Sequence, residues 1–480
     1  MAKEKQNSYE PVDASPVKSF FVYMLTRDIR LEDAILDLLD NCVDGILRTG
    51  TGKSAKDKKT PYKGFWAHIK FDRNNFEISD NCGGIPWSLH KYAFTMGREA
   101  DPGRPQDAAG TVGAYGIGMK RAIFKMGKQC SISTRNGDDA YDVEISPEWI
   151  ETKGDWLLPV EPSKTPPKYK GTTIVVGTLH ASIADRFGTD REALQNTLQQ
   201  TVETHYAAII DKGLEIKING VLMKARPVKL LFAPAKPKST KTPKAIRPFM
   251  FRSKTENGVE VFLTVGFTRP IPDPDDSESE QTQKRYAAED AGWTIICNDR
   301  AVVYCDRTEL TGWGEAGVPR YHNQFIAISG IVEFKGDSSK LPTTTTKRDV
   351  DASSRLYLQV KNKMREGMRI FTDYTNKWKK DLDESEKYIK AGEPLTLDEI
   401  KVEATHLVFN TTTKSVPPGE QYKPELPMPK KLESRQRRIS FVKPVEEIKK
   451  VAEYLFGEAE AAPSTVGEEC FDLILKDARK

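Results

Sequence analysis

The first residues that could do chemistry are acids and an amide within the run DLLDNCVD. Asp37, Asn41 and Asp44 are spaced by four and three residues, so a helix places them on one face. A carboxylate one turn from an amide offers a general base beside a neutral oxygen ligand for Mg²⁺, which keeps several of its waters. The alternative is the solvated face of an amphipathic helix, which this element taken alone favours.

A second element, ISDNCGGI, ends a predicted strand in a carboxylate that two glycines follow. Asp80 could accept a hydrogen bond from an exocyclic amine such as that of adenine. Gly83 and Gly84 would let a flat ring approach the backbone, with Ile85 beside it. The alternative is a common Asp-Asn-Gly turn, and this element alone fits that interpretation better.

The third and fourth elements add a predicted anion site and a hydroxyl. Gly113, Gly116 and Gly118 precede a predicted helix with GxxGxG spacing, and bare glycines with free N–H groups at a helix start bind anions. Lys120 lies in the first turn of that helix, where a cation opposes the helix dipole unless an anion is bound. Further on, Thr172 or Thr173 could reach Asp80 through water, although this element alone has little specificity.

These elements need a scaffold, and the hydrophobic pattern predicts one over residues 15–211. A helical pattern spans 21–47, two strands follow as a hairpin, and a glycine-rich loop over 86–118 leads into a short helix. Three more strand-like runs and a helix complete the segment. We therefore expect an α/β sandwich, one mixed sheet covered by helices.

Three further segments are expected. Residues 212–350 are rich in strand patterns and predict a second α/β domain. Residues 351–392 carry apolar residues at spacings of four and three, which predict one long helix that packs within the chain or against a second copy. Residues 393–480 form a Pro- and Lys-rich region that ends in a helical piece.

Composition excludes several classes of protein. Lys and Arg number 73 against 69 Asp and Glu, so the chain is neither a polycation that coats nucleic acid nor an acidic tail. No run of eighteen apolar residues predicts a membrane span, and the first twenty residues do not resemble a secretory signal. The six cysteines form no CxxC pair, which favours free, mostly buried thiols and a cytoplasmic location. The six histidines have no metal-ligand spacing.

Together and in this order, the four elements resemble the ATP-binding (Bergerat) fold of the GHKL superfamily. That superfamily includes the ATPase component of DNA gyrase, MutL, the heat-shock chaperones, histidine kinases and the Microrchidia (MORC) ATPases. The resemblance covers about residues 15–210, and more weakly extends to 350 as a transducer-like domain. It implies ATP and Mg²⁺ as cofactors, with Asn41 at the Mg²⁺ and Asp80 at the adenine amino group. It further places Asp44, Gly84, Ile85, Gly113, Gly116, Gly118, Lys120, Thr172 and Thr173 at the nucleotide.

The resemblance also assigns catalytic roles, with two departures from the family pattern. Asp37 takes the position of the water-activating base, where hydrolysing members usually have Glu, and Cys82 replaces the first glycine of Asp-x-Gly-x-Gly. Lys347, in the polar run LPTTTTKRDVD, is expected to reach the γ-phosphate from the transducer-like domain. An ordinary solvated lysine is the alternative.

The resulting hypothesis is an ATP-hydrolysing clamp of MORC-like or MutL-like layout that dimerises on Mg-ATP and acts on DNA in genome maintenance or defence. Two basic segments, Lys224–Lys254 and Lys430–Lys443, could contact DNA phosphates, or could be solvated loops. An ATP-sensing interaction module with little turnover and a chaperone are the alternatives, each with an unidentified protein partner. A histidine kinase is disfavoured because no phosphoacceptor helix precedes the ATPase segment.

Overall fold

The computed structural model describes most of the chain and divides it into two units, residues 1–429 and 430–480. None of the helices in the described ranges is long and apolar enough to cross a bilayer. The described residues are 17–50, 59–95, 117–152, 154, 156–233, 246–271, 290–344, 347, 349–379, 381–412, 417–429 and 441–479.

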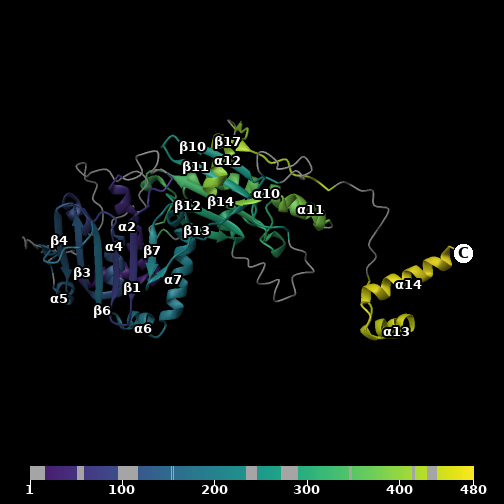
Figure 1. Ribbon diagram of the computed structural model, residues 1–480, viewed down its shortest axis with the longest axis horizontal. Helices are drawn as coiled ribbons and strands as arrows, with labels where there is room; N and C mark the ends of the chain where they lie inside the picture. Colours follow the sequence, from purple (N-terminus) through teal and green to yellow (C-terminus); the bar gives the residue numbers. More distant parts are fainter. Residues whose placement is uncertain are drawn as a thin grey trace, which may run out of the picture. The chain divides into compact units, whose positions relative to one another are not determined.

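The first unit begins with a mixed sheet of eight strands in the order β5-β4-β3-β6-β2-β1-β7-β8 (Figure 1). Its strands are β1 Trp66–Phe71, β2 Phe76–Asp80, β3 Gly127–Asn136, β4 Asp139–Ile145, β5 Val160–Pro162, β6 Gly171–Leu179, β7 Glu215–Ile218 and β8 Val221–Leu222. β1 and β2 form the expected antiparallel hairpin, and β7 runs parallel to β1.

Helices cover one face of this sheet. Along β1 every second residue, such as Ile69, is buried, and in the middle of β6 Ile174 and Val176 are buried while their neighbours are more exposed. The buried set joins α2, α4, α6 and α7 in one hydrophobic core, which makes the expected two-layer α/β arrangement. The helices of this part are α1 Lys18–Arg27, α2 Leu31–Arg48, α3 His90–Phe94, α4 Gly118–Met126, α5 Pro147–Glu151, α6 Ala181–Gly188, α7 Arg191–His205 and α8 Ala207–Asp211.

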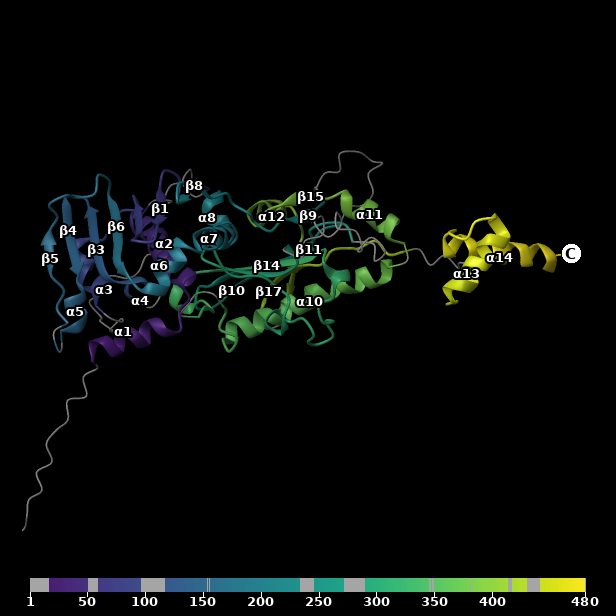
Figure 2. The same cartoon turned by 90° about the horizontal axis from the view of Figure 1, so that it is seen from below.

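A second sheet of seven strands has the order β13-β12-β14-β11-β10-β17-β16. Figure 2 shows α10 along one side of this sheet and α12 with the two-stranded ribbon β9–β15 on the other. The elements are β9 Leu230–Phe232, β10 Phe249–Lys254, β11 Glu260–Phe267, β12 Gly292–Cys297, β13 Arg300–Asp306, β14 Ile328–Lys335, α10 Arg355–Trp378, α11 Leu382–Lys390, β15 Glu393–Leu395, α12 Leu397–Ala404, β16 Asn410–Thr412 and β17 Gly419–Tyr422.

The segments join these sheets differently from the expected boundaries. β7 and β8 follow residue 211 yet complete the first sheet, because β7 pairs with β1. β15 to β17 follow residue 392, yet β15 pairs with β9 and β17 pairs with β10, while β16 pairs with β17. The sequence pattern predicted some of these strands and missed others. It does not reveal which distant strand each one pairs with, because that pairing is a property of the folded chain.

The long helix expected over 351–392 is two helices. α10 ends at Trp378 and α11 begins at Leu382, where the acids Asp383 and Glu384 suit a new helix N-terminus. The apolar stripe of α10 is fully buried against the second sheet, so of the two alternatives it packs within the chain. Its buried residues include Val360, Met364, Met368, Phe371, Tyr374 and Trp378.

The described residues of the second unit form two helices, α13 Val445–Phe456 and α14 Pro463–Ala478. The first is the expected terminal piece. The second was not predicted from the sequence, although Pro463 at its first position is a helix-start signal.

Candidate functional site

Helix α2 carries the candidate acids and is itself largely buried. Its apolar residues, such as Ile35, Leu39 and Val43, are fully buried in the first core. Asp37, Asp40 and Asp44 on the same helix are also buried, whereas Asn41 is exposed. Because a buried carboxylate is costly without partners, the neighbours of these acids decide what they can do.

Asp37 is held by an arginine from α4. Arg121 donates Nη2 to Asp37 Oδ2 at 2.6 Å, and both side chains are nearly buried. Burial is the largest influence on the Asp37 carboxyl and raises its pKa, against the opposing charges of Lys347 and Arg121. Among the residues that the structure describes, none accepts a hydrogen bond from the buried Nε of Arg121. A buried guanidinium N–H without a protein acceptor suits an anion or a water.

The glycine-rich element reaches the site through its last glycine. An ideal Cβ on Gly118 would lie 3.4 Å from the Asp37 side chain, so the start of α4 lies against α2 at this glycine. Lys120 is buried, and its ammonium donates to the carbonyl of Ala93 at 2.8 Å. Gly113 and Gly116 lie outside the described residues.

Asp80 ends β2 with its two carboxylate oxygens in different situations. Oδ1 accepts the backbone N–H groups of Cys82 at 2.7 Å and of Thr172 at 3.3 Å. Oδ2 lies 3.5 Å from the thiol of Cys42, a weak donor. Burial raises the pKa of Asp80 to about 6, and the two backbone hydrogen bonds oppose that rise.

Backbone packing around Asp80 requires glycine at two positions. Gly84 has φ +68°, and a Cβ there would lie 2.1 Å from the carbonyl oxygen of Arg135. A Cβ on Gly171 would lie 1.9 Å from the carbonyl oxygen of Asp80. The chain after β2 therefore crosses directly over β3 and β6, and it is held there by the N–H of Ile85, which donates to Thr134 Oγ1 at 2.9 Å.

Strand register separates the two candidate threonines. Thr172 pairs with Thr134 of β3, and their hydroxyl oxygens are 3.0 Å apart. Thr173 pairs with Ser79 and, because side chains alternate along a strand, points to the opposite face. Thr172 thus shares the face of Asp80, and Thr134 joins the same cluster.

Lys347, which the sequence predicts at a phosphate, contacts a carboxylate of α2 in the structure. Its Nζ lies 2.9 Å from Oδ2 of Asp40, which is fully buried. Oδ1 of Asp40 accepts from Arg300 Nε at 2.7 Å and from the hydroxyl of Tyr206 at 2.5 Å. The opposite charges of Arg300 and Lys347 outweigh burial and lower the pKa of Asp40.

Sequence reasoning did not single out Arg121, Thr134, Tyr206 or Arg300. Their roles arise from contacts that span 37 to 260 residues of chain, which no local spacing reveals. One signal was present for Arg300. It follows Asn298-Asp299, two residues at positive φ in a tight β-hairpin turn, which is where the second sheet approaches α2.

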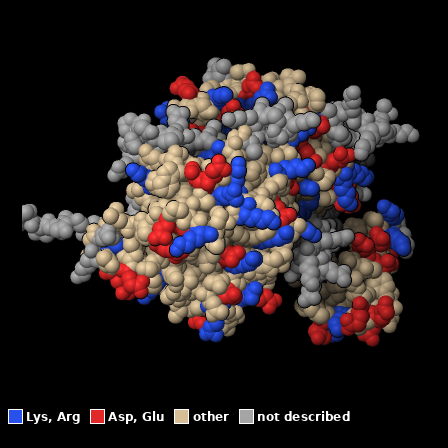
Figure 3. All heavy atoms as spheres, turned by 60° about the vertical axis from the view of Figure 1, so that its left-hand side comes forward, with Lys and Arg blue, Asp and Glu red and all other residues tan. Residues whose placement is uncertain are grey.

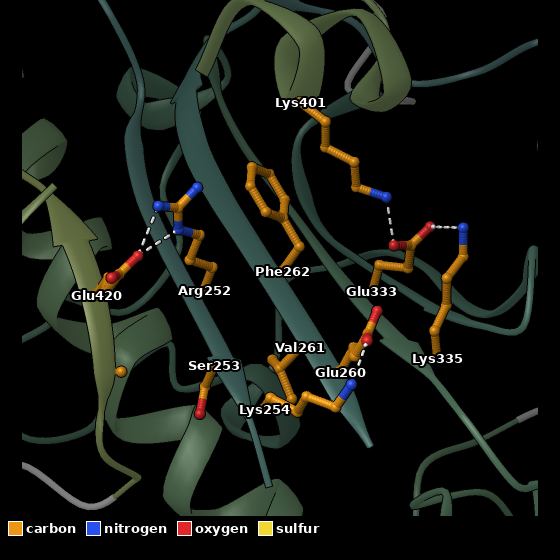
Figure 4. Close-up of a pocket in the computed structure, with 11 residues that line it drawn as sticks. Arg252, Ser253, Lys254, Glu260, Val261, Phe262, Glu333, Lys335, Lys401 and Glu420 are labelled. Atoms are coloured by element: carbon orange, nitrogen blue, oxygen red, sulfur yellow. Dashed lines mark hydrogen bonds and ion pairs between the residues drawn. The ribbon is translucent and has the colours of Figure 1, made fainter. Parts of the chain in front are cut away.

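The last residues of the first basic segment, Arg252 to Lys254, line a groove of about 520 Å³ on the second sheet (Figure 4). Arg252 pairs with Glu420 and Lys254 with Glu260, while Lys335 and Lys401 both contact Glu333. On the face in Figure 3, Lys and Arg side chains gather toward the middle with acids among them. Residues 234–245 and 430–440 of the two basic segments lie outside the described residues.

The cysteines and possible metal ligands are spread apart in the structure. All six cysteines are free, as their spacing predicted, and five of them are buried. Within the described ranges, no group of three or more His, Cys, Asp or Glu gathers to hold a metal ion. A metal at this site would therefore need oxygens from a ligand in addition to Asn41.

Residues 29–172 match the family model described as a histidine kinase-, DNA gyrase B- and HSP90-like ATPase. The match begins just before α2 and ends at Thr172, so it contains the acids of α2, Asp80 and its glycines, and α4. It does not reach Lys347 or the second sheet. No curated protein matches the chain. The chain is thus similar to this class of ATPase over residues 29–172.

Proposed function

We propose that the first sheet and its helices bind Mg-ATP and hydrolyse it, and that the second sheet responds to the nucleotide. The observation that carries the proposal is the state of Asp80. Its Oδ1 is fixed by two backbone N–H groups, which leaves Oδ2, beside the weak thiol donor of Cys42, as an acceptor for a ligand.

The base end of the site fits adenine. The amino group of adenine is a donor, and Oδ2 of Asp80 is an acceptor whose partner among the described residues is a weak thiol donor. The hydroxyls of Thr134 and Thr172, 3.0 Å apart on the same face, offer further polar contacts for a purine edge. Gly84 keeps the backbone free of a side chain at this point.

The phosphate end of the site fits an anion. Asp37 pairs with Arg121, and Asp40 pairs with Arg300 and Lys347, so these buried ion pairs hold one more cation than carboxylates. Burying a net charge is costly without a counter-ion. The orphaned Nε of Arg121 adds a donor, and the exposed Asn41 offers a neutral oxygen for Mg²⁺.

Bound Mg-ATP would supply the phosphoanhydride bond and the metal charge; the protein supplies position and proton transfer. Asp37 is the candidate base: Arg121 occupies its Oδ2, and the other oxygen can take a proton from water. Burial raises the pKa of Asp37, which makes it a stronger base than an exposed aspartate. Gly118, at the start of α4, lies next to this carboxylate.

We extend the proposal to a clamp that dimerises with ATP and acts on DNA. Its support is the resemblance in layout and the ten Lys and Arg without an acid between Gly220 and Thr255. Arg252 and Lys254 of this segment are ion-paired, so the contribution to DNA binding falls on the remaining basic residues.

A second candidate function is an ATP sensor with little turnover. The contact that favours it is the 2.6 Å pair of Asp37 with Arg121, which restrains the base candidate. Asp is also one methylene shorter than the Glu usual in hydrolysing relatives.

Steady-state phosphate release by the full chain separates the two functions. We expect Asp37→Asn to lower turnover by about 10²–10⁴-fold while ATP affinity stays within a few-fold of wild type. Asp185→Asn is the matched control, because Asp185 loses only an exposed 3.6 Å pair with Arg73. Equal phosphate release by wild type and Asp37→Asn would remove hydrolysis and leave the sensor.

A further inference from the structure

The hairpin β12–β13 joins the second sheet to the ATPase part of the first unit at two points, one partly buried and one fully buried. Asp299, in its turn, accepts from Lys212 at 2.7 Å and from the hydroxyl of Tyr62 at 3.0 Å. Arg300, the next residue, reaches Asp40 of α2. The tip of the hairpin is therefore anchored on the ATPase part of the first unit. The contact of Arg300 is with Asp40, the residue before the Mg²⁺ candidate Asn41.

The side chain of Arg300 is buried and held by several acceptors. Its side chain is 1% exposed and donates to Asp40, to Tyr206 and to the backbone carbonyl of Lys347, the last at 2.7 Å. A guanidinium with several fixed acceptors has little freedom to move without a large cost. Arg300 thus also holds the backbone at Lys347, which lies in an irregular stretch between β14 and α10.

The ammonium of Lys347 is much less satisfied. Among the described residues its Nζ contacts only Asp40 Oδ2, although it carries three N–H donors and the residue is 8% exposed. Lys347 also has φ +52°, an uncommon backbone conformation for a residue with a side chain. A buried ammonium that contacts a single carboxylate among the described residues, on a backbone held by Arg300, is placed to serve a second anionic acceptor.

We propose that Asp40 is a positioning residue that holds Lys347 on α2, and that the phosphates of a bound nucleoside triphosphate compete with Asp40 for that ammonium. Arg300 and Asp299 keep the hairpin anchored while Lys347 changes partner. Occupancy of the pocket is thereby transmitted to the segment that leads into α10. This inference rests on the proposed nucleotide site.

If Asp40 and the phosphates compete for Lys347, removing the charge of Asp40 should strengthen the preference for ATP over ADP. Asp40→Asn keeps the shape of the side chain and removes the charge that retains Lys347, so Lys347 becomes available to phosphate. We expect the ratio of ATP to ADP affinity to rise on the order of tenfold, within the usual range for coupled sites. In the Lys347→Met background the same substitution should leave the ratio unchanged, since the contested ammonium is gone.

Equilibrium binding of ATP, a nonhydrolysable ATP analogue and ADP to the full chain with Mg²⁺ tests this directly. The four proteins are wild type, Asp40→Asn, Lys347→Met and the double variant, with Asp185→Asn as a control for neutralising an acid elsewhere. A ratio that Asp40→Asn does not raise, or raises equally without Lys347, overturns the competition. If wild type binds neither nucleotide, the proposed function fails first, which is a distinguishable result.

Hydrogen exchange on wild type covers the case in which Asp40→Asn does not fold. We expect peptides that contain residues 341–350 to differ in exchange between the ADP-bound protein and the protein bound to the ATP analogue, while the hairpin at 292–306 stays protected in both. Identical exchange at 341–350 with both nucleotides overturns the inference.

Discussion

Replacing Asp80 by Asn tests how the base end of the site works. In the wild type, Oδ1 accepts two backbone N–H groups and Oδ2 remains for the ligand. An asparagine must keep its oxygen at the Oδ1 position, because an NH₂ group there would face the donors of Cys82 and Thr172. Its NH₂ then takes the Oδ2 position and meets the adenine amino group, donor against donor.

The size of the effect follows from the lost contact. A hydrogen bond to a charged acceptor contributes about 1.5–3 kcal/mol, so ATP affinity should fall roughly ten- to a hundredfold. The same NH₂ could donate to a purine that carries an oxygen at position 6. The ratio of inosine triphosphate affinity to ATP affinity should therefore be higher for Asp80→Asn than for wild type.

Titration calorimetry with ATP and with inosine triphosphate measures both affinities on the full chain. Thermal unfolding of the same samples shows whether the variant is folded, and Asp142→Asn, which removes a carboxylate bonded to Ser133 at 2.6 Å on the same sheet, serves as the control. A folded Asp80→Asn protein with wild-type affinity for ATP would refute the assignment of Asp80 to adenine.

Three further predictions concern pH, packing and DNA. Because the pKa of Asp80 is raised to about 6, its ionised carboxylate, which accepts the hydrogen bond, is lost as pH falls through 6. ATP affinity should therefore drop between pH 7 and 5. A drop of the same size in Asp80→Asn would contradict this. The stability contributed by the protonated Asp80 carboxyl is present at low pH and lost as pH rises through 6. Gly171→Ala should cost about 1–3 kcal/mol of unfolding free energy and weaken ATP binding. Gly177→Ala on the same strand should be nearly neutral, because the nearest atom to its added Cβ lies at 3.8 Å. Equal denaturant midpoints for the two variants would count against the close approach at Gly171. DNA affinity of the full chain should fall steeply across a salt series, and a flat response would argue against phosphate contacts by the basic segments.

Local patterns predicted the elements of the first sheet well. The β1–β2 hairpin, α4 and the strands around residues 130, 143 and 175 follow from alternation and helical spacing, since each period is a local property of the chain. The same reasoning found Asp80 next to its glycines. It could not choose between Thr172 and Thr173, because that choice depends on register with β3.

Long-range partners were the part that local patterns could not supply. Arg121 lies 84 residues from Asp37 in the chain, and Arg300 lies 260 residues from Asp40. Lys347 was expected at a phosphate, and nothing in the spacing of the acids on α2 marks Asp40 as its partner. Such pairs form when two sheets meet, and their energetics depend on burial that no spacing encodes.

Nucleotide binding to the unmodified full chain tests the central claim most directly. Titration with ATP in the presence of Mg²⁺ should show one site per chain, with much weaker binding of cytidine triphosphate, whose base cannot fill a purine site. If the folded protein takes up no adenine nucleotide, or binds both triphosphates equally, Asp80 does not anchor a purine and the account is contradicted.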